Sequence, residues 1–187
     1  MTGLIETEVK IPVPNSAAIL EQFDRVGLAL SAPRQFESNT LYDSGDGRLR
    51  QAGMILRLRE SGGKFVVTWK GPEEPGKHKI RPELETTVGS LDVMREILRH
   101  LGFEPVFRYE KYRREFTGGK SPSGVVTLDE TPIGNFLELE GPADWIDEMA
   151  RLLRFSPNDY LLESYGRLYR KYCERQGVEP RDMVFTS

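Results

Sequence analysis

Ile5-Glu6-Thr7-Glu8-Val9-Lys10-Ile11 lies near the start of the 187-residue chain, and in it apolar or β-branched residues alternate with charged residues. This period of two predicts a β-strand and places the three charges on one face of that strand. A charged face is also typical of an open antiparallel sheet that faces solvent. The stretch alone therefore predicts a strand with one charged and one apolar face.

The same alternation recurs along the chain, and each charged face again mixes acidic and basic residues. The other stretches are Leu56-Arg57-Leu58-Arg59, Thr68-Trp69-Lys70, Arg81-Pro82-Glu83-Leu84-Glu85, Lys111-Tyr112-Arg113, Leu128-Asp129 and Leu137-Glu138-Leu139-Glu140. We place strands at about 3–12, 34–43, 54–60, 64–70, 104–117, 125–131 and 135–141, with a fifth strand that ends near Val88. Residues 71–79 are polar and contain two prolines, so we expect a mobile loop there.

Helix signals separate these strands. Asn15 and Ser90 are good N-caps for two helices with apolar stripes, and Ser156-Pro157 predicts the start of the last helix. Many antiparallel strands with few helices indicate an α+β domain built on an eight-stranded, closed or nearly closed barrel. The helices would then cover the apolar strand faces outside, and the charged faces would line a polar tunnel. We find no linker, so residues 1–187 form one domain.

Composition limits the function classes. Hydrophobic residues make up 38% and charged residues 29%, which is typical of a globular protein, and the net charge of −3 gives no reason to expect DNA as a partner. Cys173 is the only cysteine, so no internal disulfide forms, and no apolar run has signal-peptide or membrane-spanning length. We therefore expect a cytoplasmic protein without a membrane partner. Two histidines, His78 and His100, argue against a histidine-based zinc site, and we expect both at the surface.

A charged tunnel needs a ligand. Moving a charged side chain from water into a protein interior costs roughly several kcal/mol, even after the surrounding protein relaxes. Salt bridges alone therefore do not explain why so many charges would be placed inside a barrel. Carboxylates spaced i, i+2 on a strand can hold Mg²⁺ or Mn²⁺, and arginine and lysine match phosphate oxygens. Glu6 with Glu8, and Glu138 with Glu140, are two such carboxylate pairs, which repel unless a counter-ion is present. This combination indicates phosphoryl-transfer chemistry.

These motifs, in this order, resemble the CYTH superfamily of triphosphate tunnel metalloenzymes. Its N-terminal E-x-E-x-K signature is similar to Glu6-x-Glu8-x-Lys10. Further similarity lies in Asn39-Thr40-Leu41-Tyr42-Asp43, Leu56-Arg57-Leu58-Arg59, Thr68-Trp69-Lys70-Gly71, Arg81-x-Glu83-x-Glu85, Gly134-Asn135-Phe136-Leu137-Glu138-Leu139-Glu140 and Ser164-Tyr165. The resemblance implies an eight-stranded antiparallel barrel whose tunnel binds a triphosphate-containing small molecule.

The resemblance also implies roles for single residues. Mg²⁺ or Mn²⁺ would bind Glu6, Glu8, Glu138 and Glu140, with Asp129 close by. Phosphate contacts would come from Lys10, Arg57, Arg59, Lys70, Arg81, Lys111 and Arg113. For a hydrolysis reaction we expect Lys70 to take part in catalysis, and a second metal or a carboxylate such as Glu83 or Glu85 to orient the attacking water.

The leading function is metal-dependent hydrolysis of a triphosphate that releases orthophosphate. A class IV adenylyl cyclase, which makes cyclic AMP and pyrophosphate from ATP, is the alternative, and a binding module without turnover is a third reading. The sequence leaves open which group is attached to the triphosphate: thiamine, a nucleoside, an RNA 5′ end, or none, as in bare tripolyphosphate. We favour tripolyphosphate or a small organic triphosphate, because no sequence signal predicts an adenine pocket. The sequence also leaves open whether the protein forms a homodimer.

Overall fold

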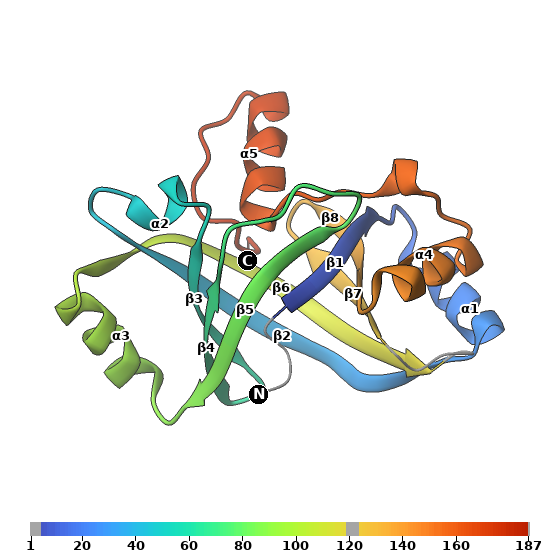
Figure 1. The fold of residues 1–187 in the computed structure, drawn as a ribbon, viewed down its shortest axis with the longest axis horizontal. Helices are drawn as coiled ribbons and strands as arrows, with labels where there is room; N and C mark the ends of the chain where they lie inside the picture. The colour runs from blue at the N-terminus through green and yellow to red at the C-terminus, as the bar shows by residue number, and fades with distance from the viewer. Residues whose placement is uncertain (1–4, 119–123, 187) are drawn as a thin grey trace.

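Eight antiparallel strands close into a barrel in the computed structural model, which describes residues 5–118 and 124–186 (Figure 1). Around the barrel the strands follow the order β1-β5-β4-β3-β2-β6-β7-β8. Their bounds are β1 Ile5–Pro12, β2 Leu28–Ser44, β3 Ile55–Ser61, β4 Lys64–Lys70, β5 Lys79–Val88, β6 Phe103–Gly118, β7 Val125–Thr131 and β8 Gly134–Glu140. The predicted α+β fold is therefore confirmed. The first two residues of the strand predicted at 3–12 lie outside the described ranges.

The helices lie outside the barrel. Figure 1 shows α1 and α4 together at one end of the molecule, α3 at the other end, and α5 standing above the strands. Their bounds are α1 Ser16–Val26, α2 Arg48–Gln51, α3 Leu91–His100, α4 Ala143–Leu152 and α5 Tyr165–Gln176, with a 3₁₀ helix at Pro157–Asp159. The predicted N-caps are present, since Asn15 Oδ1 accepts from Ala17 N and Ser90 Oγ from Val93 N. Within the described ranges, none of these helices has the length and apolar character needed to span a membrane.

The main hydrophobic core lies between the barrel wall and the helices at one end. Apolar residues alternate with charged ones along β1, β7 and β8, so these strands turn their apolar faces outward against α1 and α4. The rings of Phe23 on α1 and Phe116 on β6 meet edge to face, 4.6 Å between centroids. The core includes Val9, Ile11, Leu128, Leu137, Leu139, Ile146 and Leu153. The charged faces of the same strands therefore point into the barrel.

The prediction of a helix starting at Ser156-Pro157 was wrong. Only one 3₁₀ turn forms there, closed by Ser156 and Asp159, which hydrogen-bond reciprocally. The chain then becomes extended, because Leu161 pairs with Lys10 of β1 through backbone hydrogen bonds of 3.0 and 2.8 Å. The last helix, α5, begins at Tyr165, with Ser164 as its N-cap.

The loop before β5, predicted to be mobile, is anchored to α4. Lys77 Nζ and His78 Nε2 lie 2.8 and 3.0 Å from the carboxylate of Asp147, and Tyr160 Oη donates to the same carboxylate at 3.0 Å. His78, expected at the surface, is buried. These contacts hold Lys77 and His78 against α4.

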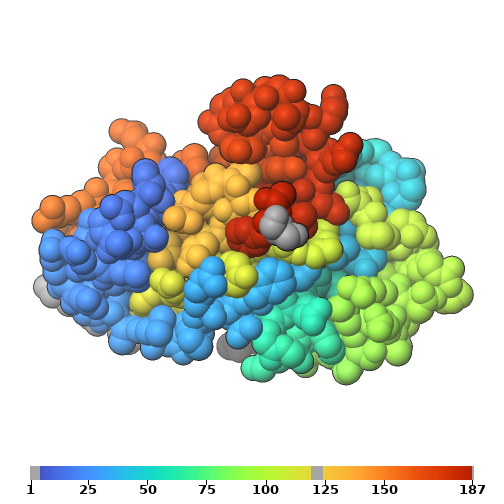
Figure 2. Space-filling model, turned by 180° about the vertical axis from the view of Figure 1, so that it is seen from behind, coloured from blue at the N-terminus to red at the C-terminus, as the bar shows by residue number. Residues whose placement is uncertain are grey.

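The tail after α5 completes the barrel wall. β7 pairs with residues 112–116 of β6, so it does not cover the part of that β6 edge that precedes residue 112. Met183 pairs in parallel with Tyr109 there, through hydrogen bonds of 2.9 Å to Arg108 O and from Glu110 N. Figure 2 shows this end of the chain, in dark red, against β6 in yellow.

Candidate active site

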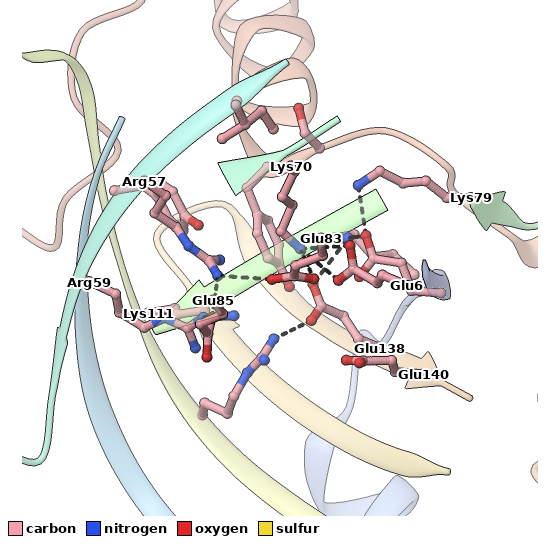
Figure 3. Close-up of a pocket in the computed structure, with 18 of the residues that line it drawn as sticks. Glu6, Arg57, Arg59, Lys70, Lys79, Glu83, Glu85, Lys111, Glu138 and Glu140 are labelled. Carbon is pink, nitrogen blue, oxygen red and sulfur yellow. Dashed lines mark hydrogen bonds and ion pairs between the residues drawn. The ribbon is translucent and has the colours of Figure 1, made fainter. Parts of the chain in front are cut away.

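The inside of the barrel holds a cavity of about 530 Å³ that is lined by seven basic and seven acidic side chains (Figure 3). They are Lys10, Arg57, Arg59, Lys70, Lys79, Lys111 and Arg113, with Glu6, Glu8, Glu83, Glu85, Glu115, Glu138 and Glu140. The structure thus brings together every site residue predicted from the sequence except Arg81 and Asp129.

Strand register explains this convergence. Residues directly opposite each other on neighbouring strands share a face of the sheet. Lys10 on β1 lies opposite Glu138 on β8, and Glu8 lies opposite Glu140. On the other side of the barrel, Lys70 on β4 lies opposite Glu83 on β5. Acidic and basic side chains from strands far apart in the sequence therefore meet across a few ångströms.

Glu6 and Glu83 hold Lys70 between them. Lys70 Nζ lies 2.6 and 2.7 Å from the two Glu6 oxygens and 3.0 Å from Glu83 Oε2. Burial, followed by repulsion from Glu8, raises the pKa of Glu6 to about 7, although Lys70 acts against this rise. Burial also opposes ionisation of Glu83, but Lys70 and Arg57 bring its pKa below the usual value. At this pair, Glu83 is therefore the carboxylate that stays ionised, whereas burial and Glu8 oppose ionisation of Glu6.

Glu8 is held by two lysines. Its Oε1 lies 2.9 Å from Lys10 Nζ and 2.7 Å from Lys79 Nζ. Burial opposes ionisation of Glu8, yet these ammonium groups lower its pKa. Burial and the nearby Lys10 lower the pKa of Lys79. Our sequence reading missed Lys79 because it ended the loop at that residue; the i, i+2 spacing to Arg81 was the available signal.

The far side of the cavity is mainly basic. Arg57 donates to Thr68 Oγ1 at 3.1 Å, and Arg59 donates to Glu85 Oε2 at 3.1 Å. Figure 3 shows both guanidiniums directed at the carboxylates across the cavity. These cations reach into the cavity from adjacent positions on one strand face, as the Leu-Arg-Leu-Arg pattern predicts.

Glu37 on β2 is a buried carboxylate that sequence analysis did not single out. It lies 3.5 Å from Arg59 and 3.6 Å from Lys111. Burial opposes its ionisation, but Lys111, Arg113 and other cations lower its pKa to about 2. Glu37 therefore stays charged and holds the basic side of the cavity in place.

Asp129 lies behind the cavity wall and has no exposed surface. Its carboxylate accepts hydrogen bonds from Lys111 Nζ at 2.8 Å, Arg113 Nε at 2.7 Å and Tyr165 Oη at 2.7 Å. The ring of Tyr165 also lies 5.3 Å from the Nζ atoms of Lys10 and Lys111. Tyr165 therefore lines the cavity and contacts its cations, while it also packs in a buried cluster with Tyr109 and Phe136.

Arg81 begins on the same face as Glu6, which lies opposite it in the register. Its guanidinium, however, extends to the end of the barrel, where Nε donates to Gly71 O at 2.8 Å and Nη2 to Gly53 O at 3.0 Å. Glu73 lies 3.3 Å from it. Arg81 thus ties the loop after β4 to the segment before β3.

The carboxylates at one side of the cavity are suitable donors for a hard divalent cation. Burial, and then Glu8 and Glu138, raise the pKa of Glu140, and Glu6 shows the same effect. A bound Mg²⁺ or Mn²⁺ would offset this repulsion through oxygen ligands. In the described part of the chain, no three carboxylate, histidine or cysteine side chains converge as one ligand set, since lysines hold Glu6 and Glu8. The donor chemistry fits such an ion.

Comparison with known proteins agrees with this geometry. The family model for the CYTH domain matches residues 4–164. A Methanocaldococcus jannaschii protein named "putative adenylate cyclase" is 29% identical over 151 residues, 80% of this chain and 84% of that protein.

Two solved structures extend the comparison. One from Vibrio parahaemolyticus, also called a "putative adenylate cyclase", has a TM-score of 0.79 at 25% identity and covers 89% of this chain and 98% of that one. The fold is shared with a Hippeastrum protein described as a "putative adenylyl cyclase" that reveals a dominant triphosphatase activity. Its TM-score is 0.61 at 15% identity, over 94% of this chain and 97% of that one. With its family model matched over most of its length, the chain belongs to the CYTH domain family.

Proposed function

We propose that this protein hydrolyses a triphosphate-containing small molecule inside the barrel, with Mg²⁺ or Mn²⁺ as cofactor. The observation that carries the proposal is the cavity of about 530 Å³ in which seven Lys and Arg side chains face a group of carboxylates. Buried cations of this number match the oxygens of a polyphosphate chain. The fold neighbour from Hippeastrum, described as having a dominant triphosphatase activity, supports the same reading.

The basic residues would bind the phosphates. Lys10, Arg57, Arg59, Lys111 and Arg113 reach the cavity and would neutralise the oxygens of the chain. Lys70, between Glu6 and Glu83, would stabilise charge that develops in the transition state.

The acidic residues would divide the remaining work. Glu6, Glu8, Glu138 and Glu140 would hold the divalent ion, which, when bound, neutralises phosphate oxygens. Glu83 or Glu85 would orient the attacking water. We propose that Asp129 acts from behind, since it fixes the positions of Lys111 and Arg113.

Adenylyl cyclase activity is the second candidate. It is favoured by the name of the Methanocaldococcus jannaschii relative, which matches 80% of this chain. In that reaction the ribose 3′-hydroxyl of ATP attacks the α-phosphate, and pyrophosphate leaves. The same cations would serve both reactions, so the products distinguish them.

The test is a panel of tripolyphosphate and ATP with Mg²⁺ or Mn²⁺, in which orthophosphate, pyrophosphate and cyclic AMP are scored together. We expect orthophosphate, and we expect Arg113→Gln to reduce its release. The matched control is Arg99→Gln, because Arg99 is exposed on α3, away from the cavity, and donates to Glu96 of the same helix. Cyclic AMP formed faster than orthophosphate would assign the cyclase reaction. Binding without any product would identify a binding module.

A further inference from the structure

Lys79 is a basic residue of the tunnel that the proposed hydrolysis does not use. It is 5% exposed, and its Nζ lies 2.7 Å from Glu8 Oε1. Strand register sets this contact, because Glu8 on β1 lies opposite Lys79 on β5. Figure 3 shows Lys79 on the side of the carboxylates away from Arg57 and Arg59. The ammonium group therefore occupies an oxygen that the proposed function assigns to a divalent ion.

That oxygen already has two cationic partners. Besides Lys79, Lys10 Nζ lies 2.9 Å from Glu8 Oε1. A divalent ion and two ammonium groups on one carboxylate repel one another, and burial strengthens the repulsion because little water screens it. Binding of Mg²⁺ or Mn²⁺ to Glu8 therefore favours the departure of one of the two lysines.

The contacts of the two lysines indicate which one leaves. Lys10 is tied to a second member of the carboxylate group, since its Nζ lies 3.1 Å from Glu138 Oε1. Lys79 instead has a carboxylate on its other side, that of Glu73, with Oε1 3.9 Å from Lys79 Nζ. Glu73 lies in the loop before β5, outside the group of proposed metal ligands. Lys79 can therefore move away from Glu8 and keep an acidic partner, which avoids the cost of a buried, unpaired charge.

We propose that Lys79 and the divalent ion exchange at Glu8, and that Glu73 receives the ammonium group of Lys79 when the ion binds. The free energy of the contact between Lys79 and Glu8 then opposes metal binding, so Lys79 sets the affinity for the ion. The inference rests on the proposed function, since it takes Glu8 as a metal ligand. It concerns metal affinity rather than turnover, and Lys79 acts in it as a positioning residue, through Glu8.

The experiment measures binding of Mn²⁺ alone to the full chain, from the loss of the electron paramagnetic resonance signal of free Mn²⁺. Lys79→Met removes the competing ammonium group and should tighten Mn²⁺ binding by about tenfold or more. Lys79→Arg keeps the charge and should stay within about threefold of the unchanged protein. Lys64→Met is the matched control, because Lys64 is exposed at the start of β4 and does not line the tunnel.

Glu73→Gln tests the other half of the exchange. It removes the acceptor for the displaced ammonium group, so Mn²⁺ binding should weaken by about threefold or more. Glu74→Gln is the control in the same loop, because Glu74 is exposed, and it should change the affinity by less than about twofold. Equal weakening by both variants would remove Glu73 as the acceptor.

Unchanged or weaker Mn²⁺ binding in Lys79→Met, or equal tightening in Lys64→Met, would overturn the exchange. The same holds if neither the unchanged protein nor Lys79→Met binds Mn²⁺. Lys79→Gln carries the same prediction and serves if the methionine variant does not fold. Failure of the proposed function shows separately, because the unchanged protein would then consume neither tripolyphosphate nor ATP in the presence of Mn²⁺.

Discussion

Glu6 is a buried cavity carboxylate whose ionisation is opposed by burial and by the neighbouring Glu8. Its pKa in the folded chain, about 7, lies above the ordinary value of 4.5 because of burial and the neighbouring Glu8. The folded state therefore binds more protons than the unfolded state between these values. Stability from this group is fully present below pH 4.5 and is lost as the pH rises through about 7.

The first prediction follows from this sign. In chelator, the melting temperature should fall between about pH 5 and about pH 7.5, and Glu6→Gln should reduce that fall because it removes the titrating group. Differential scanning calorimetry of both proteins at the two pH values measures the fall in melting temperature. Addition of Mg²⁺ should raise the melting temperature more at the higher pH. An unchanged fall in Glu6→Gln would show that another group is responsible.

Arg81 provides the second prediction at this scale. Its guanidinium is almost fully buried and hydrogen-bonds to the carbonyls of Gly53 and Gly71. Arg81→Met should lower the free energy of unfolding by about 3 kcal/mol, since buried carbonyls lose a charged donor. Urea denaturation measures this change, with Arg99→Met as the exposed control at less than about 0.5 kcal/mol. Unchanged stability together with a raised KM would instead support the phosphate contact inferred from sequence resemblance.

At the scale of elements, the strands were more predictable than the segments that join them. Alternation in stretches such as Leu56-Arg57-Leu58-Arg59 depends on local sequence, so it predicted β3 and which face is charged. The long β2, which pairs with β6 from Leu28 to Ser44, was predicted only from residue 34, because its first half depends on a distant partner. The start of α5 was missed for the same reason, since pairing of Leu161 with β1 ends the turn at Ser156.

The C-terminal tail gives the element-scale prediction. Met183 is 1% exposed and packs where the tail pairs with β6. Met183→Ala should lower the free energy of unfolding by roughly 2–5 kcal/mol, as is usual for a truncated core side chain. Val178→Ala is the matched control in the same tail, because Val178 is 54% exposed. A loss below about 0.5 kcal/mol for Met183→Ala would mean that the tail does not contribute to the barrel wall.

For the molecule as a whole, strand parity predicted the composition of the cavity but not the reach of its side chains. Lys70 and Glu138 line it as their alternation predicts. The alternation of side chains along a strand does not show that the Arg81 guanidinium extends to the end of the barrel. It also does not show that Lys111 and Arg113 enclose the carboxylate of Asp129. Tyr165 could not be assigned, because its place depends on how α5 meets the barrel rather than on the pattern of its own helix.

The whole-molecule prediction concerns ligand binding and stability. Tripolyphosphate at about 100 times its Kd should raise the free energy of unfolding by about 2.7 kcal/mol, because it binds only the folded barrel. Arg59→Ala should weaken binding by roughly 1.5–3 kcal/mol, the usual effect of a lost hydrogen bond to a charged group. Urea denaturation with and without tripolyphosphate measures the gain in stability, and calorimetric titration measures the loss of affinity, with Arg99→Ala as the control. Equal affinity in Arg59→Ala and the unchanged protein would remove Arg59 from the site.

The most direct test of the central claim is the rate of orthophosphate release from tripolyphosphate, measured first in chelator and then after Mg²⁺ or Mn²⁺ is restored. Burial, followed by repulsion from neighbouring carboxylates, raises the pKa values of Glu6 and Glu140, and a bound divalent ion would offset both effects. We therefore predict no release in chelator, recovery with either ion, and no recovery in Glu138→Gln. Full release in chelator would contradict a metal-dependent triphosphatase in this tunnel.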